Sequence, residues 1–193
     1  MNDQEFLDEE DEAFLDERDR IDAAPAEESA PPWLSRFRVE VDGSRQEYAE
    51  RLRSVLGAAL DHALAEAGID TETTPREVPG WFVAACAESG AERPLPDFAR
   101  SGSEHFTAAG LGPGWDLRGW LERFDLDLDL RRWSWWDLTG ADDRTLSLWV
   151  DAAGEDFFSC DELRWAAYLS GARSVTGPVL LRKDAWLAEA AQR

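Results

Sequence analysis

Apolar residues follow two different periods along the folded part of the chain. Residues 37–41 alternate apolar and charged side chains, which predicts a half-buried strand. From residue 44 the period lengthens to that of a helix: residues 44–47 read Ser-Arg-Gln-Glu, a capping box, and one apolar face continues to about Ala67. Gly68 then suits a left-handed C-terminal cap. We therefore predict a strand, a tight turn and a long amphipathic helix.

The same periods, together with turn residues, predict shorter elements along the rest of the chain. They are a buried helix from Gly80 to Glu88, an irregular connection over 91–114 with one helical turn near 104–109, a helix over 115–124, a helix opened by a second capping box at 159–162 and closed by Gly171, an edge strand interrupted by Gly177-Pro178, and a C-terminal helix over 183–192. These elements predict an α+β fold, a single domain in which helices pack a small, mostly antiparallel sheet. The domain spans residues 33–193, and residues 1–32 form an acidic N-terminal arm that precedes it.

Three carboxylates alternate with leucines directly after the helix predicted over 115–124. Asp125, Asp127 and Asp129 are spaced as on one face of a strand, and they match the first half of an EF-hand calcium loop. The match fails at the sixth position, which needs glycine and is Leu130, and at the twelfth, which needs glutamate and is Trp136. We therefore assign no metal site, although a weak one on this face remains an alternative.

A tryptophan-rich hairpin follows these carboxylates. If the alternation continues without a break and Leu138 pairs with Leu146, then Trp135 lies opposite Trp149, and Trp133 shares their face. Two interpretations are open. Helices cover both faces and the three tryptophans are core, which the average burial of aromatic residues favours, or the face stays open and the tryptophans form a partner-binding patch rimmed by carboxylates.

Negative charge is concentrated at the N-terminus. The chain carries a net charge of −21, and residues 1–31, with 13 acidic and 2 basic side chains, contribute −11 of it. Such a balance repels nucleic acids and anionic membranes, and it favours a protein partner with a basic surface. The alternative is that the charge only keeps the protein soluble.

The acidic arm also contains a few large apolar residues. Phe6-Leu7 and Phe14-Leu15 lie eight positions apart, close to two helical turns, so both pairs fit one side of a helix. Repulsion between like charges makes such a helix weak by itself, and we predict an arm that is either disordered or folds on binding. The arm residues predicted to contact the partner are Phe6, Leu7, Glu9, Glu10, Asp11, Glu12, Phe14 and Leu15.

No motif in the sequence is typical of catalysis or of a cofactor site. Cys86 and Cys160 are the only cysteines, and with His62 and His105 they form neither a disulfide framework nor a zinc-binding pattern. The N-terminus lacks the regions of a signal peptide, and no apolar run reaches ~18 residues. We therefore expect a cytoplasmic protein with reduced thiols and no cofactor.

Small size, acidity, abundant tryptophan and the lack of a catalytic signature make the chain similar in composition to bacterial immunity and antitoxin-type inhibitors. From the charge and this resemblance we predict a non-catalytic module that captures a basic partner, since carboxylates can occupy a cationic site that normally holds phosphate. Two alternatives are a scaffold subunit docked in an assembly by its arm, and a metal-dependent enzyme that uses Asp125, Asp127 and Asp129. The sequence does not determine the oligomeric state.

Overall fold

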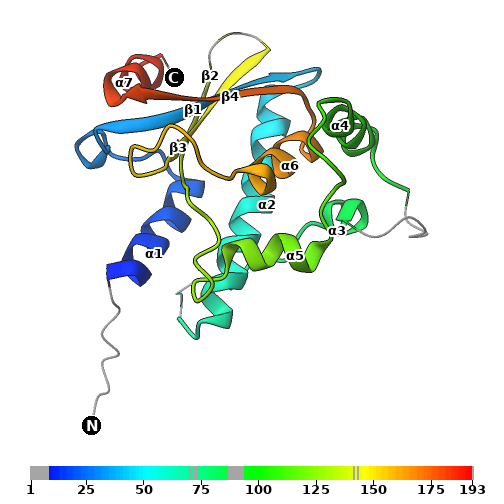
Figure 1. Ribbon diagram of the computed structural model, residues 1–193, viewed down its shortest axis with the longest axis horizontal. Coiled ribbons are helices and arrows are strands. Elements are labelled where there is room, and N and C mark those ends of the chain that lie inside the picture. The colour runs from blue at the N-terminus through cyan, green and yellow to red at the C-terminus, as the bar shows by residue number, and fades with distance from the viewer. Residues whose placement is uncertain are drawn as a thin grey trace.

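A four-stranded antiparallel sheet with the strand order β2-β3-β1-β4 forms the centre of the computed structural model (Figure 1). Its strands are β1 (Trp33–Val41), β2 (Ser134–Gly140), β3 (Thr145–Asp151) and β4 (Ala172–Arg182). The structure describes residues 9–69, 71, 74–86, 94–140, 142 and 144–192. The sheet and the helices packed on it confirm the predicted α+β fold.

Helices lie on both sides of the sheet. They are α1 (Glu9–Asp22), α2 (Arg45–Glu66), α3 (Gly80–Cys86), α4 (Asp97–Ala108), α5 (Leu117–Leu121), α6 (Asp161–Leu169) and α7 (Lys183–Ala190), with short 3-10 helices η1 (Glu27–Ser29) and η2 (Glu122–Phe124). The group from α2 to α6 packs on one side, and α7 lies on the other (Figure 1). Of the helices described, none is both long enough and apolar enough to cross a membrane.

Each side of the sheet has its own hydrophobic core. The larger core lies between the sheet and α2 and includes Phe37 and Leu148. The smaller core lies beneath α7, where Trp136, Trp149 and Trp186 are almost completely buried. The rings of Trp136 and Trp186 meet edge to face with their centroids 5.6 Å apart. Tryptophan therefore contributes much of the apolar area that attaches α7 to the sheet.

The hairpin of β2 and β3 has a different register from the predicted one. Leu138 pairs with Leu148, two positions from its predicted partner, and a bulge at Trp136 adds one residue to β2. Because a one-residue shift moves a side chain to the opposite face of a strand, Trp135 lies in the larger core, whereas Trp136 and Trp149 lie in the smaller one. The predicted placement of Trp135 beside Trp149 on one face is therefore wrong.

Local signals predicted the long helix well and the shorter ones less well. The Ser44 hydroxyl accepts a hydrogen bond from the Glu47 amide at 3.3 Å at the start of α2, and Gly68 follows its end with a φ of +73°, as expected. The second capping box does not form, because α6 begins at Asp161 after Cys160, whose side chain makes no capping hydrogen bond. The predicted irregular connection over 91–114 contains instead the 12-residue helix α4.

The edge strand β4 is protected by side chains that bond to its backbone. Tyr168 Oη accepts from the Val175 amide at 3.2 Å, and Arg164 donates to the Gly177 carbonyl at 2.5 Å. His105 Nδ1 lies 3.4 Å from the Ala172 carbonyl, and Pro178 has no amide to offer. These contacts occupy groups with which a further strand would pair.

Candidate functional site

The three tryptophans predicted to bind a partner are core residues. Trp133, Trp135 and Trp149 are 4%, 1% and 0% exposed. Each indole N–H is also satisfied inside the protein: Trp133 donates to Glu162 Oε1 at 2.6 Å, Trp135 to the Arg20 carbonyl at 3.1 Å, and Trp149 to a threonine hydroxyl at 2.9 Å. The covered-face interpretation therefore holds, and the assignment of these residues to an exposed patch is corrected.

The described part of the acidic arm packs on the domain through α1. Glu17, only 2% exposed, accepts hydrogen bonds from Arg131 at 2.5 and 2.6 Å and from the Trp135 amide at 2.6 Å. Arg20 Nε donates to the Trp135 carbonyl at 3.1 Å, and Ile21 is fully buried in the larger core. Side chains of α1 thus satisfy a backbone N–H and C=O on the edge strand β2, as a neighbouring strand would. The part of α1 from Phe14 to Ile21 is therefore packed on the domain.

The opposite face of α1 carries exposed carboxylates. Glu12, Asp16 and Asp19 follow the spacing i, i+4, i+7, which places them along one side of the helix, and all three are exposed. We call these three residues the α1 acidic stripe. Helical periodicity therefore separates Glu17, which is used for packing, from the stripe, which faces solvent and in which Asp19 lies 3.4 Å from Arg18.

The other arm residues predicted to bind a partner are distributed as follows. Phe14 and Leu15 are half-buried, and the Phe14 ring centroid lies 5.3 Å from the guanidinium carbon of Arg131. Asp11 is half-buried as well. Phe6 and Leu7 lie outside the described residues, as do the side chains of Glu9 and Glu10.

Arginine side chains are largely engaged within the protein. Asp61, almost completely buried, accepts from Arg76 Nε at 2.8 Å and from Arg18 Nε at 2.9 Å. Burial by itself would raise the pKa of Asp61, but the hydrogen bonds from Arg76 and Arg18 outweigh it and hold that pKa below its ordinary value. Further arginines paired with carboxylates are Arg36, Arg38, Arg51, Arg100, Arg118, Arg123, Arg131, Arg132 and Arg173.

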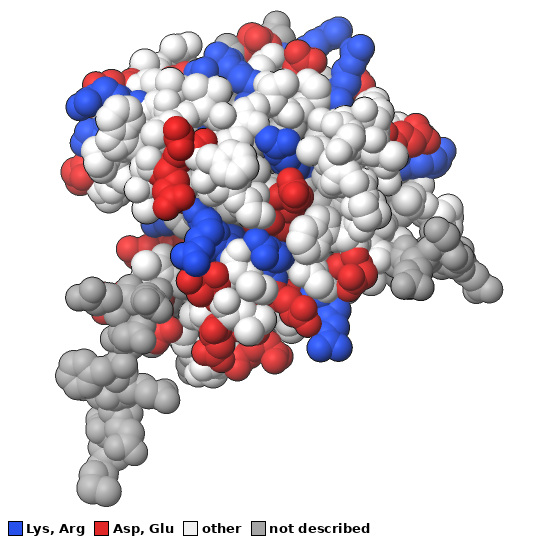
Figure 2. All heavy atoms as spheres, in the orientation of Figure 1, with Lys and Arg blue, Asp and Glu red and all other residues white. Residues whose placement is uncertain are grey.

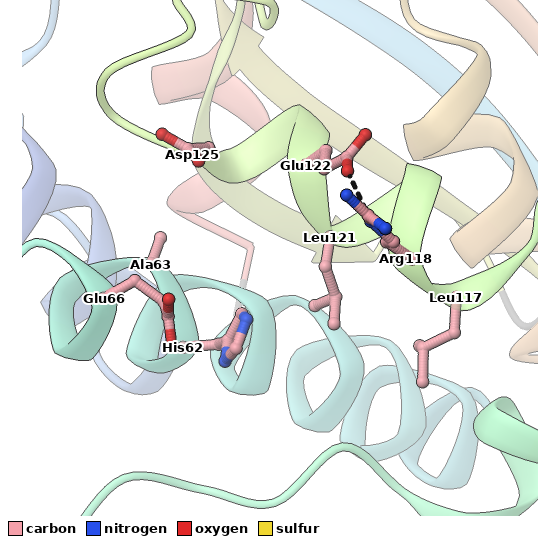
Figure 3. A pocket seen from close by; sticks show the side chains of 8 residues that line it. All are labelled: His62, Ala63, Glu66, Leu117, Arg118, Leu121, Glu122 and Asp125. Carbon is pink, nitrogen blue, oxygen red and sulfur yellow. Dashed lines mark hydrogen bonds and ion pairs between the residues drawn. The ribbon is translucent and has the colours of Figure 1, made fainter.

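A cleft of about 440 Å³ lies between the C-terminal half of α2 and the helical segment formed by α5 and η2 (Figure 3). We call it the α2–α5 cleft. It is lined by His62, Ala63, Glu66, Leu117, Arg118, Leu121, Glu122 and Asp125. In Figure 3, Leu117 and Leu121 point from α5 toward α2. His62 and Glu66 project from α2, which forms the other wall of the cleft. The cleft thus has an apolar interior and a charged rim, the composition usual for ligand sites.

Carboxylates outnumber cations on the rim of the α2–α5 cleft. Glu122 accepts from Arg118 Nε at 2.8 Å, so these two charges largely compensate each other. Asp125 Oδ1 accepts a hydrogen bond from the Asp127 amide at 2.9 Å. Because the amide is neutral, this contact does not compensate the charge of Asp125. Glu66 is exposed, and the ion pairs found among the described residues include neither Glu66 nor Asp125. The rim therefore favours a cation.

Asp125, Asp127 and Asp129 do not lie along a strand, as the alternation with leucine had predicted. Residues 126–129 form turns, and β2 begins only at Ser134. Asp129 has a φ of +43° and pairs with Arg132 at 3.3 Å. In the part of the chain that the structure describes, no group of three or more His, Cys, Asp or Glu side chains is placed to hold a metal ion. The predicted strand face on which the metal-dependent alternative placed these carboxylates is therefore not formed.

Both cysteines are packing residues. Cys86 and Cys160 are 5% exposed, and burial is the main cause that raises the pKa of each thiol to about 11. Cys86 Sγ accepts a hydrogen bond from Trp165 Nε1 at 3.5 Å. Neither thiol has the lowered pKa that a nucleophile needs.

Comparison of the chain with protein-family models, with curated proteins and with solved structures finds no match. Sequence reasoning missed the α2–α5 cleft, because its two walls come from distant segments. His62, at the edge of the apolar face of α2, gave no sign of a cleft in the sequence, where it was considered only as a zinc ligand.

Proposed function

We propose that the protein is a non-catalytic binding module that captures a basic protein partner through its acidic surface. The observation that carries this proposal is the separation of charge between the interior and the surface. Arg18, Arg76 and Arg131 pair with the buried carboxylates Asp61 and Glu17, whereas the α1 acidic stripe and many other carboxylates remain exposed. Figure 2 shows red carboxylates spread over the face in view, several of them next to blue side chains.

Such a surface accelerates and strengthens association with a cationic protein. Exposed carboxylates attract a basic partner over a distance set by the ionic strength, about 8 Å at physiological salt. The same surface repels nucleic acids and anionic membranes, which limits the partner to a basic protein or peptide. In its most concrete form the protein is an inhibitor of the immunity or antitoxin type, whose carboxylates occupy a cationic site of a toxin or nuclease.

The test compares charge removal on α1 with equal charge removal elsewhere. The stripe variant carries Glu12→Gln, Asp16→Asn and Asp19→Asn. The matched control carries Glu40→Gln, Glu104→Gln and Glu155→Gln, three exposed carboxylates on other parts of the surface. Each protein is immobilised and used to purify partners from its native host, and the affinity for each retained protein is then measured at several salt concentrations.

We expect retention of a protein with a basic surface, whose affinity falls steeply with salt and falls more in the stripe variant than in the control. Loss of about 0.2–1 kcal/mol per removed carboxylate corresponds to a decrease of a few-fold to about 100-fold for the three together. Retention of partners whose binding does not depend on salt or on either set of carboxylates would overturn the proposal. That result would favour the scaffold alternative.

A further inference from the structure

We infer that the α2–α5 cleft receives one arginine or lysine side chain of the partner. This inference rests on the proposed function and adds to it a specific anchoring point. Surface charge alone attracts a basic protein but does not fix its position, whereas a cleft that encloses one cationic side chain does.

The interior of the cleft suits the aliphatic stem of a basic side chain. Leu117 and Leu121 are half-buried and point from α5 toward α2, where Ala63 is 5% exposed. Lysine and arginine bury their methylene groups along apolar surfaces while their charged ends stay near polar groups. A cleft of about 440 Å³ is large enough for such a side chain.

The rim suits the charged end. Glu66 on α2 and Asp125, which follows η2, both line the cleft, so two separate elements contribute carboxylates to its rim. A cation at the rim is attracted by both charges. A neutral apolar group would fill the interior but would gain nothing at the rim, and an anion would be repelled. Charge complementarity therefore selects a basic side chain as the occupant.

Removal of the Arg118 charge should strengthen binding, whereas removal of the rim carboxylates should weaken it. Its side chain is 89% exposed and neutralises Glu122, which also lines the cleft. Arg118→Ala should leave the fold intact, because an exposed side chain contributes little to stability. It should also free the Glu122 carboxylate for the incoming cation. Binding of a basic side chain should therefore become stronger, by about twofold to fivefold, and a misfolded protein cannot mimic such a gain.

The probe is the peptide acetyl-Gly-Arg-Gly-amide, titrated at low ionic strength into the full chain and followed by NMR. We expect saturable shifts of the Leu117 and Leu121 methyl groups and of the His62 ring. A peptide with lysine in place of the arginine should cause similar shifts, and comparison of the two affinities shows which cation the cleft prefers. The citrulline peptide has nearly the same shape without the charge, and it should cause no saturable shift.

Two variants with equal loss of charge complete the experiment. Glu66→Gln with Asp125→Asn removes both rim charges, while the asparagine keeps the side-chain oxygen that accepts the amide of Asp127. This variant should bind the arginine peptide about fivefold more weakly or worse, and the control Glu40→Gln with Glu104→Gln should change it by less than about twofold. Equal affinities in the two variants, equal binding of citrulline, or no gain from Arg118→Ala would overturn the inference. A rim variant that still captures the basic host partner with full affinity would also overturn it but would leave the proposed function standing.

Discussion

Replacement of Glu17 by alanine should destabilise the protein more than any other change to a carboxylate of α1. The substitution leaves the Arg131 guanidinium, whose side chain is 7% exposed, buried without its charge partner. It also leaves the Trp135 amide without its acceptor. Removal of one partner from a buried ion pair costs about 3–5 kcal/mol. For a chain of this length the loss corresponds to a decrease in Tm of roughly 6–20 °C.

The surroundings of Arg131 allow the contribution of charge to be separated from that of shape. Its guanidinium carbon lies 4.9 Å from the Phe124 ring centroid and 4.8 Å from that of Trp133, in a pocket that an apolar side chain can fill. The double variant Glu17→Met with Arg131→Met should therefore be less destabilised than either single variant. The Trp135 amide still lacks an acceptor, so about 1–3 kcal/mol of the loss should remain.

Urea denaturation followed by tryptophan fluorescence and by far-ultraviolet circular dichroism measures these differences. Glu12→Ala is the matched control, because Glu12 lies on the same helix and is exposed. It should change the free energy of unfolding by less than about 0.5 kcal/mol. If Glu17→Ala and Glu12→Ala unfold at the same urea concentration, then α1 is not docked on β2, and the division of its carboxylates into a packing face and a stripe is wrong.

Three further predictions concern the interior. Gly102→Ala places a Cβ 1.9 Å from a backbone carbonyl oxygen of α6 and should cost about 3 kcal/mol or more by urea denaturation, whereas Gly43→Ala meets no atom within 4 Å and should change stability little. Cys86 and Cys160 should react with a thiol reagent at pH 8 only as fast as the protein unfolds, and immediately in urea, because both are buried and have a raised pKa. The lowered pKa of folded Asp61 stabilises the protein above about pH 4, and this contribution is lost as the pH falls through the folded pKa. The urea midpoint of Asp61→Asn should therefore lie below that of the wild type at pH 7 and approach it in acid.

The sequence predicted those helices whose start and end depend on local groups. α2 combines a serine cap, a continuous apolar face and a glycine after its end, and all three signals lie within the helix and its immediate neighbours. α4 was missed because Ser101, Gly102 and Ser103 are typical of a loop. The reason for the glycine is tertiary, since α4 approaches the backbone of α6 so closely that no Cβ fits at position 102. Packing against another helix overrides propensity there.

The sheet was predicted correctly in class but not in register. The alternation of side chains across Trp133, Trp135 and Trp149 assumed an unbroken strand, and a single bulge at Trp136 redistributes the tryptophans between two cores. Sequence patterns do not reveal such a bulge when the residues on both faces are apolar. The buried role of Glu17 was equally hidden. Glu17 lies among other carboxylates of the arm with similar local surroundings, and its partner Arg131 lies far along the chain.

The two faces of α1 determine how the function can be tested cleanly. Deletion of the whole arm removes the exposed stripe, but it also removes Ile21 from the larger core and uncovers the backbone of Trp135 on an edge strand. An uncovered edge strand promotes association between chains. Loss of partner binding in such a deletion would therefore report damage to the fold as readily as loss of a recognition surface. Neutral substitutions at Glu12, Asp16 and Asp19 avoid this ambiguity, because they change the charge that the partner meets while leaving every contact of α1 with β2 in place.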